Sequence, residues 1–462
     1  MKKITKLFIG TAAFTFLFYN QSPGLNIAFV GLITWLLIFL KPAEKIKHGN
    51  FFWFLSVCVF FSACAFAWCG DVFSFLALFF SILILGIQSQ YPRINVLLYP
   101  LLWLINYATF IFRFFSFKYW FPKRKADNNS WKKLIALVLI PAFFGLIFIA
   151  LYSSGSDLFY SFFQQFTFNF NFFEVIFLSC LGFFLLFNLW FMLIPKAVIK
   201  LNSSLTQDFT ANQQINFKPT FSFLEINFER KSGEMSLILL NILLLFFIVT
   251  YNYEQFFSIA SKATLSDEIH QRVITIIISI IMAIAVIMFY FKSTFNFDKN
   301  AALLKKLSYI WILLNAVLIV SAFVKNTEYV SSLGLTYKRI GVYIFLTLSL
   351  IGLFVTYLKI KLKKTNSFLL NRMVKVFFIT FILTSGINFS WIVTSYNISH
   401  HKNTDIEYLK SLSFNKQILF NTYKNDPGWQ SYFANQKESI EWEKSKSFLS
   451  STLYFSWLKI DK

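Results

Sequence analysis

Charged residues, cysteine, histidine and proline are all scarce in this chain. Of its 462 residues only 14% are charged, and there are four cysteines, four histidines and nine prolines. A soluble domain is about 25% charged, so an ordinary soluble enzyme fits this composition poorly. So few cysteines in so long a chain exclude a disulfide-stapled secreted module, and the apolar content excludes a disordered chain.

Sequence signatures of known chemistry are missing as well. The chain contains no Walker loop, dinucleotide fingerprint, HExxH, GxSxG or kinase motif. All four cysteines fall in apolar runs and are interpreted as small hydrophobic residues. The adjacent His400 and His401 have no third ligand nearby, so we predict neither a metal nor a cofactor.

Apolar residues are abundant instead, at 57% of the chain, and 64 residues are Phe. A helix needs roughly 20 mostly apolar residues to cross a bilayer. Twelve runs approach or reach that length, at residues 5–20, 25–40, 51–68, 73–87, 94–115, 134–152, 172–193, 235–251, 273–291, 307–323, 339–358 and 374–396. The predicted fold class is therefore all-α, a polytopic helical integral membrane protein. The basic start is interpreted as the beginning of an uncleaved first span, because no small-x-small cleavage site follows it.

The net charge of +22 is interpreted as an orientation signal. Lys and Arg in short loops mark the cytoplasmic side of a bacterial inner membrane. The basic clusters at 2–6, 41–47, 118–133, 292–306 and 359–375 can all lie inside only if one apolar run does not cross. We therefore predict about eleven transmembrane helices, with the N-terminus cytoplasmic and the C-terminus extracytoplasmic. This arrangement places 29 of the 43 basic residues inside, and nucleic acid is not expected as a partner.

The run at 94–115 is the best candidate for the one that does not cross. It carries Asn95, Tyr99, Asn106 and Arg113 at offsets that place them on one helical face. We interpret it as an amphipathic helix at the cytoplasmic interface. The alternative is a true span whose polar stripe faces neighbouring helices, with another run failing to cross.

Five consecutive segments follow from this arrangement. Residues 1–116 form an N-terminal membrane region, residues 117–193 contain further spans, and residues 194–234 are a cytoplasmic loop. Residues 235–397 form a C-terminal bundle, and residues 398–462 an extracytoplasmic helical tail. Within the loop, residues 217–230 could form a hairpin or a linker. Within the tail, Thr404 or Asp405 is expected to cap a helix, and the whole is expected to be a small cap docked on the outer loops.

Two sets of polar residues are candidates for function. One is a stripe within the last apolar run, formed by Thr380, Thr384, Asn388 and Ser395, to which Asn188, Asn241 and Asn315 add amides in other runs. Hydrogen bonds between membrane helices would explain such residues without any ligand. The other set lies at the predicted outer surface and comprises Glu268, Arg272, Thr336, Arg339, Asp405 and Tyr408, which could line a ligand or partner site or simply pair with one another.

Several short motifs resemble a bacterial family of membrane proteins, the domain of unknown function 4153 with its relative 4173. Gly-Leu-Thr-Tyr-Lys-Arg at 334–339 resembles its GLTxxR element, and Ser-Asp-Glu-Ile-His-Gln-Arg at 266–272 resembles its SxAEYxRRGF stretch, with Gln271 in place of an arginine. The segment 232–241 is similar to a stretch that ends in a Leu-Asn pair. Tyr-Asn-Ile at 396–398 followed by Asp-Ile-Glu-Tyr-Leu at 405–409 resembles its YNI…DxxYL tail. The resemblance implies a polytopic fold and no established activity.

Three functions remain open from the sequence. The first is a non-enzymatic protein that binds a ligand, or a membrane or periplasmic protein partner, at its outer face in sensing, assembly or envelope maintenance. The second is a transporter or flippase of a lipid-like substrate, which would use the polar stripe and predicts a cavity between the last spans. The third is an enzyme acting on lipid-linked substrates, with Asp267 or Glu268 as its base.

Overall fold

The structure is a computed structural model that describes residues 2–40, 49–116, 140–156, 171–215, 225–257, 265–292, 294–400 and 405–459, together with positions 137 and 159. Of the described residues 84% are helical, and no strand occurs among them. The all-helical prediction is confirmed at this level. Residues 217–224 of the segment left open between hairpin and linker lie outside the described residues, and residues 226–230 are helical.

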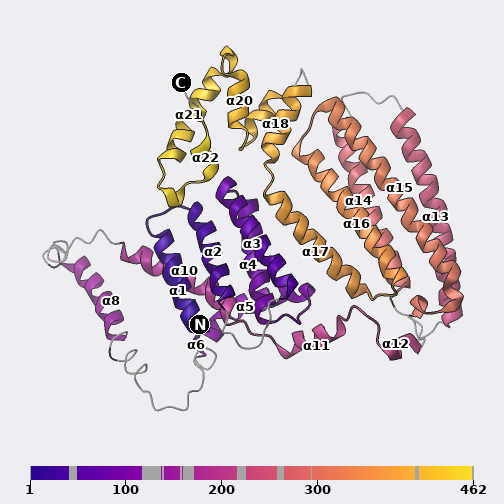
Figure 1. Cartoon of the computed structure of the whole chain (residues 1–462), viewed down its shortest axis with the longest axis horizontal. Coiled ribbons are helices and arrows are strands. Elements are labelled where there is room, and N and C mark those ends of the chain that lie inside the picture. Colours follow the sequence, from indigo (N-terminus) through magenta and orange to yellow (C-terminus); the bar gives the residue numbers. More distant parts are fainter. Residues whose placement is uncertain are drawn as a thin grey trace. The chain divides into compact units, whose positions relative to one another are not determined.

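The helices divide into long and short ones (Figure 1). Those of fifteen residues or more are α1 (Lys3–Phe18), α2 (Leu25–Phe39), α3 (Asn50–Cys69), α4 (Val72–Gln90), α8 (Ile140–Gly155), α10 (Phe172–Trp190), α13 (Ile226–Phe257), α14 (Leu265–Tyr290), α15 (Ala302–Leu333), α16 (Tyr337–Lys361), α17 (Asn366–Ser385) and α21 (Gln430–Ser445). The shorter helices include η1 (Val96–Leu98), α5 (Tyr99–Ala108), α6 (Phe110–Phe115), α11 (Lys196–Ser204), α12 (Ala211–Ile215), α18 (Phe389–His400), α19 (Ile406–Ser411), α20 (Lys416–Tyr423) and α22 (Leu453–Trp457).

Seven described helices are long and apolar enough to cross a membrane. They lie in α3, α4, α10, α13, α15, α16 and α17, and each coincides with a predicted apolar run. Helices α1, α2, α8 and α14 coincide with four further runs, but α2 has only 15 residues, about 22 Å of helix against a hydrocarbon core of about 30 Å. The count of eleven therefore stays a prediction.

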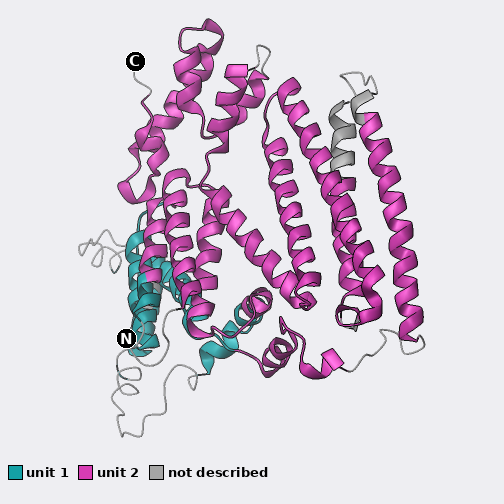
Figure 2. Cartoon of the chain, turned by 45° about the vertical axis from the view of Figure 1, so that its right-hand side comes forward, with its two compact units in different colours: residues 1–22, 36–44, 104–193 teal, residues 23–35, 45–103, 194–462 magenta. Residues whose placement is uncertain are grey.

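The chain forms two compact units that interleave along the sequence (Figure 2). Unit 1 contains residues 1–22, 36–44 and 104–193, and unit 2 contains residues 23–35, 45–103 and 194–462. The sequence-based division into five consecutive segments did not anticipate this interleaving, because proximity in the sequence says nothing about which helices pack together.

Unit 1 is built around the packing of α1 against α10. The Thr15 and Ser179 hydroxyls are 3.0 Å apart across these two helices, and the Glu174 carboxylate accepts the Asn20 N–H at 2.8 Å. The buried Lys6 ammonium donates to the Leu37 carbonyl at 2.6 Å and lies over the Trp190 ring. Small hydroxyls and a carbonyl-bound lysine thus hold apolar helices together, as is usual where water is scarce.

The core of unit 2 lies among α13, α14, α15 and α16, which run side by side in Figure 1. Leu237, Ile280, Leu318 and Leu346 are among its fully buried members. Polar bonds also cross this core. The Trp311 indole donates to the Ala283 carbonyl at 3.2 Å, and the Asn241 amide donates to the Leu307 carbonyl at 3.1 Å.

The run at 94–115 is not one helix. It breaks into η1, α5 and α6, and the longest piece has ten residues, too short to cross a bilayer. Three of the four polar residues of the predicted face are buried rather than facing water: Tyr99 and Asn106 are each 1% exposed and Arg113 is 3% exposed, whereas Asn95 is half-buried. The interfacial location stays a prediction, but the polar face is directed into protein.

Backbone carbonyls explain that burial. The Arg113 guanidinium donates to the Phe191 carbonyl at 2.7 Å and also bonds Asn188 and the Asn106 carbonyl. The Asn106 amide donates to the Leu193 carbonyl at 2.9 Å and accepts the Leu193 N–H at 2.7 Å. These bonds satisfy main-chain groups at the C-terminal end of α10, which have no partner within the helix itself.

The last apolar run, 374–396, is also interrupted. Helix α17 begins earlier, at Asn366, and ends at Ser385, and α18 begins at Phe389. Gly386 follows the end of α17, and the Asn388 side chain accepts the Trp391 N–H at 3.0 Å, which starts α18. A hydropathy profile does not register this interruption, because the residues on both sides of it are apolar.

The tail folds back on other parts of unit 2. Its buried cluster includes Leu409, Leu412, Leu419 and Trp429 together with Val393 of α18. The Leu25 N–H donates to the Ser451 carbonyl at 3.0 Å, and the Trp68 and Trp457 rings are 6.1 Å apart. Asp405 caps α19, as one of the two predicted caps, and Thr404 lies outside the described residues.

Replacing Gly70 with alanine tests how the tail is seated. Gly70 ends α3 at φ +67°, and a Cβ there would lie 2.4 Å from the Thr452 methyl. We expect Gly70→Ala to destabilise the protein by about 1–2 kcal/mol through the left-handed backbone alone, and more through the clash. Thermal unfolding of the purified protein in detergent measures this.

Gly49→Ala is the matched control, because nothing lies within 4 Å of a Cβ at Gly49 and its φ is −72°. Equal melting temperatures for Gly70→Ala and wild type would contradict the contact between residue 452 and the α3–α4 turn.

Candidate functional site

The motif at 334–339 forms the connection between α15 and α16. Gly334 has a φ of +83°, and a Cβ there would lie 2.7 Å from Asn397 Oδ1, so the position suits glycine. The Thr336 hydroxyl caps α16 by accepting the Arg339 N–H at 3.3 Å. The Arg339 guanidinium donates to the Leu333 carbonyl at 3.1 Å and to the Gly334 carbonyl, so it caps the C-terminal end of α15.

Asn397 of α18 and Tyr408 of the tail bind the same connection. Asn397 of α18 pairs with the Leu335 main chain, accepting its N–H at 2.6 Å and donating to its carbonyl at 2.9 Å. The Tyr408 hydroxyl accepts the Tyr337 N–H at 2.9 Å. Burial raises the pKa of Tyr408, so this phenol stays protonated near neutral pH.

Four of the six predicted outer-surface residues therefore belong to one cluster. Thr336 and Arg339 lie in the connection, Tyr408 bonds to it, and Asp405 caps α19 by accepting the Tyr408 N–H at 3.0 Å. We call this cluster the junction. Its side chains are occupied by main-chain groups, so its geometry indicates a fastening between α15, α16 and the tail.

The other two predicted residues, Glu268 and Arg272, lie in the first two turns of α14. Their side chains lie outside the described residues, as does that of Asp267. The structure therefore provides no geometry for an enzyme that uses Asp267 or Glu268 as its base.

Sequence reasoning did not select Asn397 or Asn326 as site residues. Asn326 of α15 donates to the Arg339 carbonyl at 3.1 Å and so supports the junction from a second side. The sequence could have identified Asn397, because it is the asparagine of the Tyr-Asn-Ile motif at 396–398.

A cavity of about 600 Å³ lies in unit 2 next to the junction. It is bounded mainly by α16 and α17, with contributions from the α3–α4 turn, α18 and the segment 411–414. Its polar residues include Asp71, Tyr337, Thr380, Thr384, Asn388 and Ser390. Its apolar residues include Phe73, Ile340, Ile344, Leu348, Phe377, Phe381 and Phe414.

Three of the four residues of the predicted polar stripe line this cavity. They are Thr380, Thr384 and Asn388, whereas Ser395 does not line it. The stripe assumed one continuous helix, and the interruption between α17 and α18 removes Ser395 from the shared face. Asn388 also donates to the Phe414 carbonyl at 2.9 Å, which fixes one wall of the cavity.

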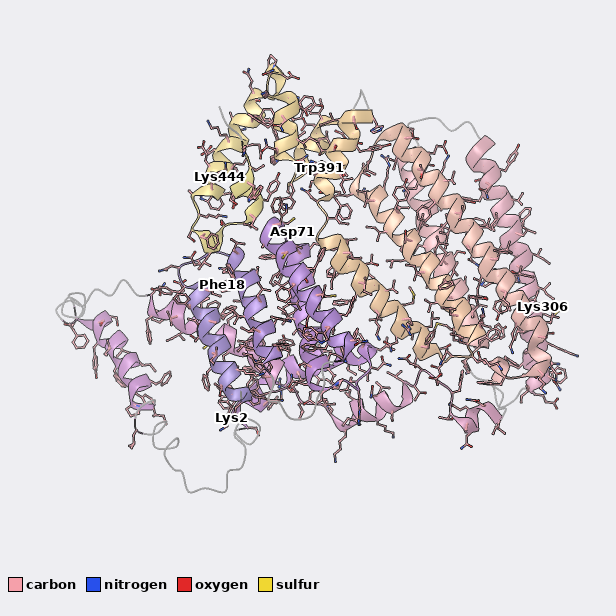
Figure 3. The ribbon with its side chains drawn as sticks, viewed as in Figure 1. Lys2, Phe18, Asp71, Lys306, Trp391 and Lys444 are labelled. Carbon is pink, nitrogen blue, oxygen red and sulfur yellow. The ribbon has the colours of Figure 1, made fainter. Side chains whose placement is uncertain are left out.

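Asp71 is the only charged residue among those that line the cavity, and the sequence analysis did not identify it. Figure 3 labels it at the turn between α3 and α4. One of its carboxylate oxygens, Oδ1, caps α4 by accepting the Ser74 N–H at 3.0 Å and also the Ser74 hydroxyl. Its place in the tight turn Cys-Gly-Asp at 69–71, between two apolar runs, is the signal that could have revealed it.

The remaining amides in apolar helices have local partners. Asn188 bonds to Arg113 and donates to the Phe184 carbonyl at 2.8 Å, and Asn315 donates to the Trp311 carbonyl at 2.8 Å. Among the described residues, no group of three or more His, Cys, Asp or Glu is arranged to hold a metal ion.

The described part of the chain is thus all-helical, with seven helices capable of crossing a membrane, a tail bonded to the α15–α16 connection and a cavity beside that connection. The chain belongs to the family "Domain of unknown function (DUF4153)", whose model matches residues 8–418. The resemblance inferred from the motifs is thereby confirmed. No curated protein and no solved structure matches the chain significantly.

Asn397→Ala tests the junction. We expect it to destabilise the protein by about 2–3 kcal/mol, because the buried Leu335 N–H and carbonyl both lose their partner. The melting temperature in detergent measures this. Ser399→Ala, which removes an exposed hydroxyl bonded within its own helix, is the matched control and should change stability by less than about 0.5 kcal/mol. Equal melting temperatures for the two variants would exclude the junction as a fastening.

Proposed function

We propose that this protein is a bacterial inner-membrane protein that binds an amphipathic ligand in the cavity between α16, α17 and the tail, at its outer face. The observation that carries this proposal is the composition of the cavity. Its volume of about 600 Å³ is in the range of small-molecule sites, and its mostly apolar walls carry a few polar groups. Ligand binding of this kind would serve sensing, assembly or envelope maintenance.

The distribution of charge supports the orientation that this proposal requires. In unit 2 the tail, the α3–α4 turn and the cavity lie at one end of the helices. The basic residues Lys306, Lys359, Lys361 and Arg372 lie at the other end, and Figure 3 labels Asp71 and Lys306 at these opposite ends. Lys and Arg favour the cytoplasmic side, so the cavity end would be extracytoplasmic. About eleven spans, a cytoplasmic N-terminus and an extracytoplasmic cap complete the proposed topology.

The cavity indicates the chemistry of its ligand. The Asp71 carboxylate is aimed at a ligand group that donates hydrogen bonds or carries positive charge, since no described residue donates to its second oxygen, Oδ2. Tyr337 and Ser390 share a hydrogen bond at the same end, and Ser390 also accepts the Phe414 N–H at 3.3 Å. The Phe and Ile side chains of α16 and α17 would hold the apolar part of the ligand.

The junction would couple this cavity to the tail. Tyr337 lines the cavity and its N–H bonds to Tyr408, so the same residue contacts both places. A ligand that displaces Tyr337 or Phe414 would therefore disturb the tail, where a membrane or periplasmic partner could detect the change.

One observation favours a second function, movement of a lipid-like substrate. The cavity is lined by Thr380 and Thr384 of α17 and by Asn388, which follows this helix, as a transport route through this stripe requires. Reconstituted protein that binds a fluorescent phospholipid but does not move it between leaflets would support ligand binding and exclude transport.

Gly341→Leu tests the cavity without disturbing the helices. Gly341 lines the cavity, and nothing lies within 4 Å of a Cβ built there, so a leucine would occupy the space that the ligand needs. We expect an amphipathic molecule to copurify with the wild-type protein and to be lost from Gly341→Leu, with an unchanged melting temperature. Mass spectrometry of an extract of the purified protein measures this loss.

Gly145→Leu is the matched control, because it also places a leucine in open space on an apolar helix, and Gly145 does not line the cavity. Asp71→Asn should weaken retention of the same molecule about tenfold, the usual scale for a hydrogen bond to a charged group. Equal retention by all three variants and wild type would exclude the cavity as the binding site.

A further inference from the structure

A second cavity lies in unit 2, at the basic end of the helices opposite to Asp71. Its volume is about 410 Å³, and it is enclosed by the loop after α4, the C-terminal part of α11 with the residues that follow it, and the first turns of α17. The proposed function does not use it, and the inference below does not depend on that proposal.

Side-chain amides fix the frame of this cavity. The Asn202 side chain accepts the Asn95 N–H at 2.8 Å and donates to the Arg93 carbonyl at 3.2 Å. The Asn95 side chain donates to the Leu205 carbonyl at 3.3 Å. The Thr365 N–H donates to the Gln207 carbonyl at 3.2 Å, which ties the same segment to the start of α17. Hydrogen bonds between these segments therefore hold the walls of the cavity in place.

The lining carries positive charge without a carboxylate. Arg93 and Lys375 line the cavity, and no Asp or Glu does. Neither cation forms an ion pair with a described residue. Asn371 also lines the cavity, is 5% exposed, and its Oδ1 has no hydrogen-bond partner among the described residues. A buried amide oxygen without a partner is costly and calls for a donor from a ligand or water.

An apolar cavity of about 340 Å³ adjoins the polar one. The two share Phe51, Val96 and Lys375, and Lys375 Nζ lies 4.8 Å from the centre of the Phe51 ring. The apolar cavity continues along Phe54, Ile84 and Phe378 of α3, α4 and α17, three helices that are able to cross a membrane. Arg372 lies at its rim as a third cation.

We propose that these two cavities together bind one anionic glycerophospholipid from the leaflet at the basic end. Arg93 and Lys375 hold its phosphate, and a hydroxyl of the headgroup donates to Asn371 Oδ1. An acyl chain lies along Phe54, Ile84 and Phe378. Basic pockets beside membrane helices on the cytoplasmic side have the chemistry that binds anionic headgroups.

Native mass spectrometry of the full chain in detergent tests this proposal. The probes are phosphatidylglycerol, phosphatidylcholine with the same acyl chains, and soluble glycerol 3-phosphate. We expect retention of one phosphatidylglycerol in preference to phosphatidylcholine and no retention of glycerol 3-phosphate. Arg93→Gln and Lys375→Gln should each weaken binding of phosphatidylglycerol about fivefold, the scale of one cation near an anionic lipid.

Lys306→Gln is the matched control, because Lys306 is an exposed cation at the same end that lines neither cavity. Lys375→Arg should retain the preference. If Lys375→Gln does not fold, Asn371→Leu is tested in its place, because this change keeps both charges. Phosphatidic acid, which has no headgroup hydroxyl, is then the additional probe. We expect the wild-type preference for phosphatidylglycerol over phosphatidic acid to be lost in Asn371→Leu.

Three results would overturn the proposal. The first is equal retention of phosphatidylcholine and phosphatidylglycerol. The second is wild-type binding by folded Arg93→Gln and Lys375→Gln. The third is retention of glycerol 3-phosphate, which would make the occupant a soluble phosphate rather than a membrane lipid.

Discussion

Main-chain groups at the ends of apolar helices need hydrogen-bond partners, and this requirement accounts for the bonds made by several buried cations in the structure. Lys359 is fully buried, and its ammonium donates to the Phe291 carbonyl at the end of α14 at 2.7 Å. Arg339 does the same for α15, and Arg113 for the residues after α10. A chain with so few charged residues uses them at the places where a free carbonyl would otherwise lie in an apolar environment.

The same constraint separates the residues that hold helices together from the residues that line the cavity. The motif residues Thr336, Arg339 and Tyr408 are occupied by main-chain groups, so they position elements rather than offer free polar atoms. The free space lies next to them, where α17 ends at Ser385 and α18 begins at Phe389. Asn388, which lies in this interruption and caps α18, also forms part of one wall of the cavity. Asp71 lines the same cavity.

Two of the cavities described in unit 2 differ in the sign of their charge. The cavity beside the tail has the Asp71 carboxylate, and the cavity at the basic end has Arg93 and Lys375. In the proposed orientation the positive cavity faces the cytoplasmic leaflet and the negative one faces outward. The same asymmetry of Lys and Arg would orient the protein and select an anionic lipid at its inner end.

The sequence alone determined the helical class, the positions of the apolar runs and the family, because hydrophobic runs of membrane length and short edge motifs are local properties. It also found Thr380, Thr384 and Asn388, which line one cavity, since they lie close together in one apolar run. It could not determine that Ser395 leaves this face, that Arg113 is buried against the Phe191 carbonyl, or that Asp71 meets Ser390 across one cavity. Those facts depend on contacts between segments 78 to more than 300 residues apart, and only the packing of helices decides which of their polar groups find a partner and which line a cavity.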